Sequence, residues 1–189
     1  GTGIAQRSPE FIRQLMLERK AVIAHTRRGV WVGFCYIESW SHGRYVANSG
    51  LIVAPAFRKT GVARAIKKRI FELSRQKYPD AKIFGLTTGL TVMKINSELG
   101  YEPVTFSELT DDIQFWNGCK SCLNYDILLS KERKNCLCTA MLYDPVEVKK
   151  NGKKRLFDFA AKRRGLERLQ RIKRTWLNKF LKEKKAEMV

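Results

Sequence analysis

The feature that most constrains this chain is a strand–turn–helix pattern over residues 49–65, SGLIVAPAFRKTGVARA. An apolar run ends at Pro55, a basic turn with Gly61 follows, and the helical spacing of apolar residues begins at Val62. The first turn of a helix leaves backbone N–H groups without acceptors, and the helix dipole adds about half a positive charge there. Because glycine lets the backbone approach a phosphate closely, the pattern predicts an anion site at a helix N-terminus.

The rest of the chain places this pattern inside a single sheet. Apolar periodicity and turn residues predict a helix at 8–19, strands at 21–24, 30–40 and 45–54, a helix ending near 77, a strand at 81–86, a helix at 92–99 and a strand at 101–104. This order is typical of an α+β fold in which helices cover one sheet.

The turn and its surroundings resemble the GNAT superfamily of acyl-CoA N-acyltransferases. Residues 58–63, RKTGVA, match that family's R/Q-x-x-G-x-G/A loop at the required strand-to-helix junction. A second match is IFGLTT…SELGYEPV, in which Gly100 and Tyr101 take the place of the usual Gly-Phe. The resemblance covers about residues 19–104 and implies a GNAT-like central mixed, mostly antiparallel sheet flanked by helices. Members usually open with a strand and a helix before the first helix seen here, so a further N-terminal extension is expected.

The resemblance also implies a mechanism. Backbone N–H groups of the loop would hold the pyrophosphate of acetyl-CoA or another acyl-CoA, and the pantetheine arm would pair with the end of the preceding strand. An N–H group at Val53 would polarise the thioester carbonyl, and a neutral amine of a small molecule would attack directly. The residues implied to bind the co-substrate are Ile52, Val53, Arg58, Lys59, Thr60, Gly61, Val62 and Ala63.

The catalytic acid and base are less clear from the sequence. Many family members carry a Tyr four residues before the final Gly, where this chain has Asn96. Tyr101 is then a candidate acid. Glu38 and His42 are candidate bases, because they lie near the end of a strand where an amine could approach. A solvent-exposed turn residue is the alternative interpretation of His42.

A shorter similarity concerns the acceptor. The run Leu86-Thr87-Thr88 resembles the acetyltransferase domains of N-acetylglutamate synthases, between the same strand and helix. It implies an α-amino acid acceptor such as glutamate, whose carboxylate would bind Thr87, Thr88 and Lys94. The alternative is that Thr88 caps the following helix.

Four cysteines form two close pairs beyond the region of resemblance. Thirteen residues separate the pair Cys119 and Cys122 from the pair Cys136 and Cys138. A strand at 123–129 and a turn at 131–135 would make a Cys-rich hairpin that brings the pairs together, as in structural zinc sites with four thiolate ligands. Buried reduced thiols are the alternative. A strand at 138–143 could complete the sheet.

The C-terminal region has a separate composition. Of the 37 Lys and Arg and 18 Asp and Glu, 16 and 4 lie in residues 149–189, which therefore carry +12 of the net charge of +19. Apolar residues at helical spacing predict a basic amphipathic helix here, at Leu166, Leu169, Ile172, Trp176 and Phe180. It could dock on the body, on a second copy in a homodimer, on an anionic membrane or on nucleic acid.

These features define three predicted regions and two alternative functions. The regions are an N-acyltransferase core at 1–110, a Cys-rich segment at 111–148 and the basic helix at 149–189. The first function is an acyl-CoA-dependent N-acyltransferase. The second is a non-catalytic zinc-containing module with a basic tail that binds nucleic acid or an anionic membrane. The sequence shows no signal peptide and no apolar run near the roughly 20 residues that span a bilayer, so a cytoplasmic location is expected.

Overall fold

The computed structural model describes residues 6–151. Within them the helices are α1 (Pro9–Leu17), α2 (Val62–Lys77), α3 (Leu90–Glu98), α4 (Ile113–Asn117), α5 (Tyr125–Ser130) and α6 (Pro145–Asn151). The strands are β1 (Ala21–His25), β2 (Trp31–Trp40), β3 (Tyr45–Val53), β4 (Lys82–Thr87), β5 (Glu102–Val104) and β6 (Thr139–Tyr143). The predicted basic helix at 149–189 lies almost wholly outside the described residues and stays a prediction.

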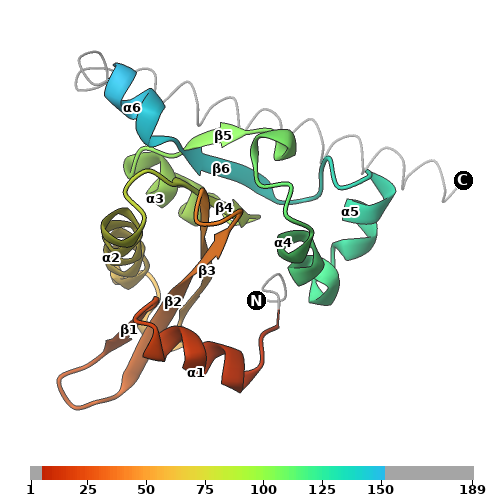
Figure 1. Cartoon of the computed structure of the whole chain (residues 1–189). Helices are drawn as coiled ribbons and strands as arrows, with labels where there is room; N and C mark the ends of the chain where they lie inside the picture. Colours follow the sequence, from red (N-terminus) through yellow and green to blue (C-terminus); the bar gives the residue numbers. More distant parts are fainter. Residues whose placement is uncertain (1–5, 152–189) are drawn as a thin grey trace, which may run out of the picture. The chain divides into compact units, whose positions relative to one another are not determined.

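The strands form one mixed sheet in the order β1-β2-β3-β4-β6-β5 (Figure 1). β3 and β4 run parallel, and every other neighbouring pair is antiparallel. The predicted α+β fold with a mostly antiparallel sheet is therefore confirmed. The expected strand over 138–143 is present as β6 and lies between β4 and β5.

The sheet opens between its two parallel strands. β3 pairs with β4 only over Tyr45–Ala47, opposite Lys82–Phe84, yet β3 continues to Val53. Beyond this point β4 pairs with β6 alone. We call the point of divergence the fork, and the part of β3 beyond it the open edge. An edge strand presents backbone N–H and C=O groups to any extended partner.

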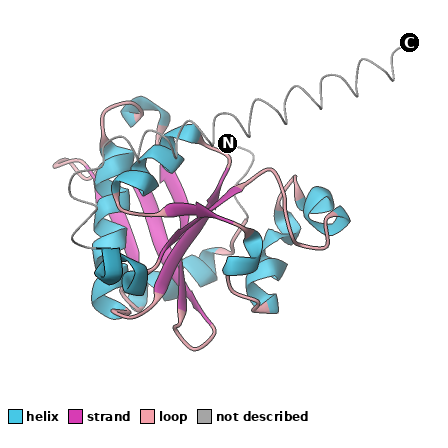
Figure 2. Ribbon diagram, turned by 90° about the horizontal axis from the view of Figure 1, so that it is seen from above, coloured by secondary structure: helices cyan, strands magenta, loops and turns pink. Residues whose placement is uncertain are grey.

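Helices cover both faces of the sheet (Figures 1 and 2). On one face, α2 packs on β2 and β3, and α3 packs on β4 and β6. On the other face, Phe11 of α1 contacts the ring of Tyr36, and Phe115 of α4 contacts the ring of Phe84. A group that enters the fork would therefore meet α2 and α3 on one face of the sheet and α1 and α4 on the other.

The Cys-rich segment differs from its prediction. The expected strand at 123–129 is wrong, because Tyr125–Ser130 forms helix α5 instead. Leu128 is buried in a core cluster and Tyr125 packs against the same cluster, a spacing of three that suits a helix rather than a strand. The segment is therefore built from short helices, and the two cysteine pairs do not lie on a hairpin. No helix among residues 6–151 is long and apolar enough to cross a membrane.

Candidate functional site

The loop after β3 forms the helix N-terminus that the sequence predicted. Gly61 is the N-terminal cap of α2 and has φ +89°, a left-handed conformation that favours glycine. Lys59 also has positive φ, at 64°. The Thr60 hydroxyl donates to the carbonyl of Phe57 at 2.6 Å, which holds the turn. The first turn of α2 carries no acidic residue, so nothing there opposes the binding of an anion.

The basic side chains around this loop differ in their partners. Arg58, Lys59 and Thr60 are exposed. Arg64, in the first turn of the helix, is held by two hydrogen bonds of 2.8 and 2.9 Å to the carboxylate of Glu98. Nε of Arg58 donates to the carbonyl oxygen of Val53 at 3.2 Å, so its side chain lies along the end of β3.

Alternate residues of the open edge of β3 point their backbone groups away from β2. The N–H of Ala54, just after β3, donates to the carbonyl of Val32 in β2 at 2.8 Å. Because N–H groups alternate along a strand, the N–H and C=O of Val53 point to the opposite side, beyond the fork. This orientation is the one that the predicted polarising role of Val53 requires. The Ile52 side chain is exposed and borders an apolar cavity of about 380 Å³ with Phe34 and Trp31.

A bulge shapes the edge near the fork. Phe34 pairs with Ile52 and Tyr36 pairs with Ser49, so two residues of β3 stand opposite one residue of β2. Gly50, within this bulge, has φ +64° and lies under the ring of Tyr36. A Cβ on Gly50 would lie only 2.2 Å from Cε1 of that ring. The close approach depends on glycine and fixes Tyr36 beside the open edge.

Glu38 lies at the level of the fork in a charged cluster. It is 7% exposed and pairs with Ala47, the last residue of β3 that also pairs with β4. Nη2 of Arg7 donates to its carboxylate at 3.3 Å, and Nη1 of Arg7 donates to the carbonyl of Gly118 at 3.4 Å. Burial, helped by the charge of Glu38, raises the pKa of Tyr36 to about 12. The structure thus joins Arg7, Tyr36 and Glu38, of which the sequence predicted only Glu38.

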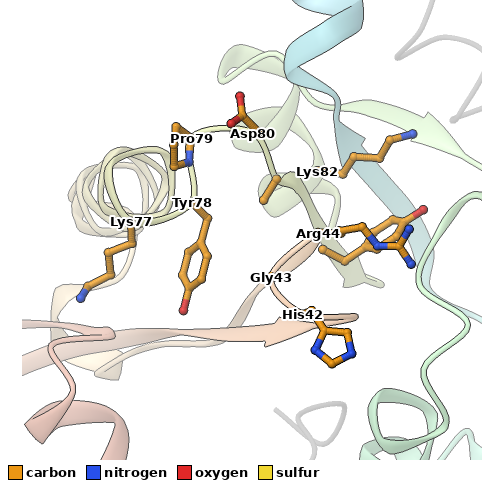
Figure 3. A pocket seen from close by; sticks show the side chains of 10 residues that line it. His42, Gly43, Arg44, Lys77, Tyr78, Pro79, Asp80 and Lys82 are labelled. Atoms are coloured by element: carbon orange, nitrogen blue, oxygen red, sulfur yellow. The ribbon is translucent and has the colours of Figure 1, made fainter.

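His42 lies elsewhere. It occupies the exposed turn between β2 and β3, at the paired end of β3 and β4, with φ +56°. Its side chain borders a separate cavity of about 540 Å³ with Arg44, Lys77 and Lys82 (Figure 3). Glu38 and His42 are therefore not brought together at the fork.

On the α2 face, a buried polar chain reaches the fork from the other side. The Tyr101 hydroxyl donates to Oδ1 of Asn48 at 3.0 Å, and Nδ2 of Asn48 donates to the Ser74 hydroxyl at 2.8 Å. Burial raises the pKa of Tyr101 well above its usual range. Asn96 is 1% exposed, and Nδ2 lies 3.8 Å from the Met141 sulfur. Within residues 6–151, Oδ1 of Asn96 has no hydrogen-bond partner.

The residues expected to bind an acceptor carboxylate lie at the turn before α3. Oγ1 of Thr87 accepts the N–H of Gly89 at 3.0 Å, and this bond shapes the turn. Thr88 and Lys94 are exposed. Leu86 packs with the core on the α4 face, so strand alternation turns Thr87 toward the opposite face from the Arg7–Glu38 pair.

The four cysteines of the Cys-rich segment lie near one another. Cys119, Cys122 and Cys136 each interact electrostatically with Cys138, and the N–H of Cys138 donates to the sulfur of Cys136 at 3.3 Å. All are reduced and none is paired in a disulfide. In the described part of the chain, no three His, Cys, Asp or Glu side chains are arranged to hold a metal ion.

The fold is similar to those of solved acetyltransferases. N-acetylglutamate synthase from Neisseria gonorrhoeae, complexed with coenzyme A and N-acetyl-glutamate, matches 75% of this chain with a TM-score of 0.54 and 14% identity. Rv2747 from Mycobacterium tuberculosis, in complex with CoA and NLQ, matches 76% of this chain and 86% of its own, with a TM-score of 0.55 and 17% identity. A GNAT superfamily phosphinothricin acetyltransferase from Sinorhizobium meliloti, in complex with AcCoA, matches 76% of this chain and 75% of its own, with a TM-score of 0.51 and 12% identity.

These likenesses show that the chain has the GNAT fold, as the loop and its context predicted. The chain spans only 29% of the Neisseria protein. No protein-family model matches the sequence. The search of curated proteins finds no match either.

Proposed function

We propose that this chain, which has the GNAT fold, is an acyl-CoA-dependent N-acyltransferase that moves an acetyl or related acyl group to the amine of a small molecule. The observation that carries the proposal is the continuous path from the fork to the N-terminus of α2. Along it, backbone groups of β3 that β4 does not pair lead directly into a glycine-capped helix end, which is preceded by the exposed Arg58 and Lys59 and has no acidic residue in its first turn. An extended amide chain that ends in a pyrophosphate, which is what CoA offers, fits both parts of this path.

On this proposal, the donor binds mainly through backbone groups. The N–H groups at 59–63 hold the pyrophosphate, and Arg58 and Lys59 add charge. The pantetheine amides pair with the open edge, and one of them replaces Arg58 at the carbonyl of Val53. The freed guanidinium can then turn toward the phosphates. The N–H of Val53 polarises the thioester carbonyl as negative charge develops on it.

We propose that the acceptor is an α-amino acid. A zwitterion carries a carboxylate and an ammonium on adjacent atoms, and the Arg7–Glu38 pair offers the two complementary charges at 3.3 Å from each other. The Neisseria neighbour, complexed with N-acetyl-glutamate, supports this class of acceptor. Glu38 takes the proton from the ammonium, and the neutral amine attacks the thioester carbon.

The leaving CoA sulfur needs little assistance. A thiol has a pKa of about 8–9, so it departs as a thiolate near neutral pH and is then protonated by water. This agrees with the presence of Asn96 in place of an acidic hydroxyl. Tyr101, the predicted acid, already donates its hydroxyl to Asn48 inside the core. A Tyr101→Phe variant that keeps its turnover number would exclude a catalytic role for this hydroxyl.

Binding of acetyl-CoA, measured by calorimetry, tests the donor site. Gly61→Glu should abolish binding, because it places a negative charge at the helix N-terminus where the pyrophosphate lies. Gly29→Glu is the matched control, since Gly29 also has positive φ, at 79°, but lies in a distant turn. The proposal is wrong if the parent protein binds no CoA, or if both variants bind equally well.

Release of free thiol with a panel of amines then tests the reaction. Amino acids should be acylated faster than amines that lack a carboxylate, and Arg7→Ala should raise KM for amino acids much more than for those amines. Glu38→Gln should lower kcat by about 10²–10⁴-fold, the usual contribution of a general base. Equal rates for both acceptor classes would exclude the amino-acid assignment and leave the acyltransferase assignment intact.

A further inference from the structure

A short helix outside the region of GNAT resemblance holds Arg7, the cation of the proposed acceptor site. This helix, η3 (Gly118–Ser121), belongs to the Cys-rich segment. Nη1 of Arg7 donates to the carbonyl oxygen of Gly118 at 3.4 Å, at the start of η3. The N–H of Gln6 donates to Oγ of Ser121 at 3.0 Å, at the end of η3. Two neighbouring residues before α1 are thus anchored to the two ends of one turn.

The backbone at Gly118 does not require a glycine. Its φ of −61° and ψ of −20° are those of a right-handed helix, which any L-amino acid readily adopts, and glycine is among the poorest helix formers. A Cβ on Gly118 would instead meet Arg7, at 2.9 Å from Nη2, 3.6 Å from Cζ and 3.7 Å from Nη1. The three nearest atoms all belong to the guanidinium. The space left by the missing side chain of Gly118 is therefore the space next to which the guanidinium lies.

We propose that Gly118 is a positioning residue for the acceptor, because it leaves the room in which Arg7 is aimed at the acceptor's carboxylate. The proposal rests on the proposed acyltransferase function. Nη2, the atom that a Cβ on Gly118 would displace, is the same nitrogen that donates to the carboxylate of Glu38 at 3.3 Å. A guanidinium has five N–H donors, so Arg7 can hold Glu38 and the α-carboxylate of an amino acid together. Selection of amino acids then depends on a residue that touches neither substrate.

The other contacts of Arg7 define the position that an added Cβ would disturb. Cζ of Arg7 lies 5.8 Å from the centre of the Phe11 ring, and Nη1 also donates to the carbonyl oxygen of Gln6 at 3.2 Å. The Arg7 side chain is 21% exposed, whereas that of Glu38 is 7% exposed and needs its cation. Because a long arginine side chain changes rotamer more easily than a helix shifts its backbone, a methyl group at position 118 displaces Arg7 and leaves the fold intact.

The variant Gly118→Ala of the full chain tests the proposal in the thiol-release assay. We expect KM for amino acids to rise about 10–100-fold, the usual effect of losing a hydrogen bond to a charged group, with a much smaller change in kcat. The Kd of acetyl-CoA and the KM for amines that lack a carboxylate should stay the same, a pattern that a general loss of structure does not produce. Asn117→Ala is the matched control, because it changes the exposed residue directly before Gly118 and adds no Cβ.

A double-mutant cycle with Arg7→Ala shows whether Gly118 acts through Arg7. Once Arg7 is removed, Gly118→Ala should cause no further rise in KM for amino acids and no loss of stability in urea. Gly118→Ser adds the same Cβ and should behave in the same way. Effects of the two substitutions that simply add overturn the proposal. An active parent whose KM values do not change in Gly118→Ala overturns this inference alone, whereas a parent that releases no thiol with any amine overturns the proposed function itself.

Discussion

At the scale of single residues, Gly50 is the position on which the geometry of the fork depends most. Any other residue at this position would have to adopt a left-handed backbone conformation, and its Cβ would clash with the ring of Tyr36. We predict that Gly50→Ala lowers the free energy of unfolding by about 1–2 kcal/mol for the backbone alone, and by more once the ring is displaced. Turnover should fall as well, because Tyr36 lies beside Glu38.

Urea denaturation at one temperature measures this effect. Gly29→Ala is the matched control, because its φ is also positive but nothing lies within 4 Å of an added Cβ. It should lose only the backbone contribution and keep full activity. If the two variants are equally stable, the ring of Tyr36 does not lie over Gly50 as described.

The buried Lys67 leads to a second prediction at this scale, which concerns how the free energy of unfolding depends on pH. Lys67 of α2 is 2% exposed, lies 5.5 Å from the centre of the Tyr101 ring and interacts with Cys35. Burial lowers its pKa from the usual 10.5. Between the lowered pKa and the usual one, the unfolded chain binds more protons than the folded chain. The free energy of unfolding therefore rises with pH in that window, and falls as the pH is lowered.

Replacing Lys67 should remove its contribution to the pH dependence of the free energy of unfolding. We expect Lys67→Met to be more stable than the parent by about 1–3 kcal/mol near pH 7, with a flatter profile up to about pH 8.5. The exposed Lys68→Met serves as the control and should change neither quantity. The comparison stops at about pH 8.5 because Cys35 affects the stability above that pH. Burial raises the pKa of the Cys35 thiol from 9.0 to about 11, so between these two values the free energy of unfolding falls as the pH rises. A parent profile as flat as that of the variant contradicts the assignment.

At the scale of elements, the sequence could predict turns and helix ends, because these depend on residues that are adjacent in the chain. The loop at 58–63 was found because a glycine, a basic turn and the start of a helix follow one another within a few positions. The helix predicted at 92–99 ends before Gly100 in the same way, and Gly100 has φ +90°, a left-handed conformation that favours glycine. Such features arise from local backbone preferences, which a short stretch of sequence specifies fully.

Contacts between distant elements could not be predicted in this way. Arg7 and Glu38 are 31 residues apart, and nothing in the sequence around Arg7 distinguishes it from an exposed arginine before a helix cap. Tyr36 carried a weak signal, because it stands two residues before Glu38 and so shares its face of the strand. The error at 123–129 has a related cause, since a short apolar run fits a buried strand or a short helix equally well until its packing partners are known.

At the scale of the whole molecule, the candidate site and the strongly basic tail belong to different parts of the chain. The residues of the predicted and proposed donor and acceptor sites lie between Arg7 and Tyr101, and the compact unit that contains them ends at Lys150. Residues 1–150 hold 23 of the 37 Lys and Arg and 14 of the 18 Asp and Glu, so about half of the net charge of +19 lies beyond them. Acyl-CoA binding and any retention on polyanions should therefore be separable.

A chain ended after Lys150 tests this separation. We expect it to bind acetyl-CoA with a Kd within about threefold of the full chain, a difference of less than 1 kcal/mol, because backbone groups of β3 and α2 supply the site. Its elution from heparin should need less salt, since fewer cations release fewer counterions. Both chains are compared in the same buffer, with Gly61→Glu in each as the non-binding reference. If the shortened chain folds, as judged by its melting transition, but loses acyl-CoA binding tenfold or more, the tail belongs to the site and the separation is wrong.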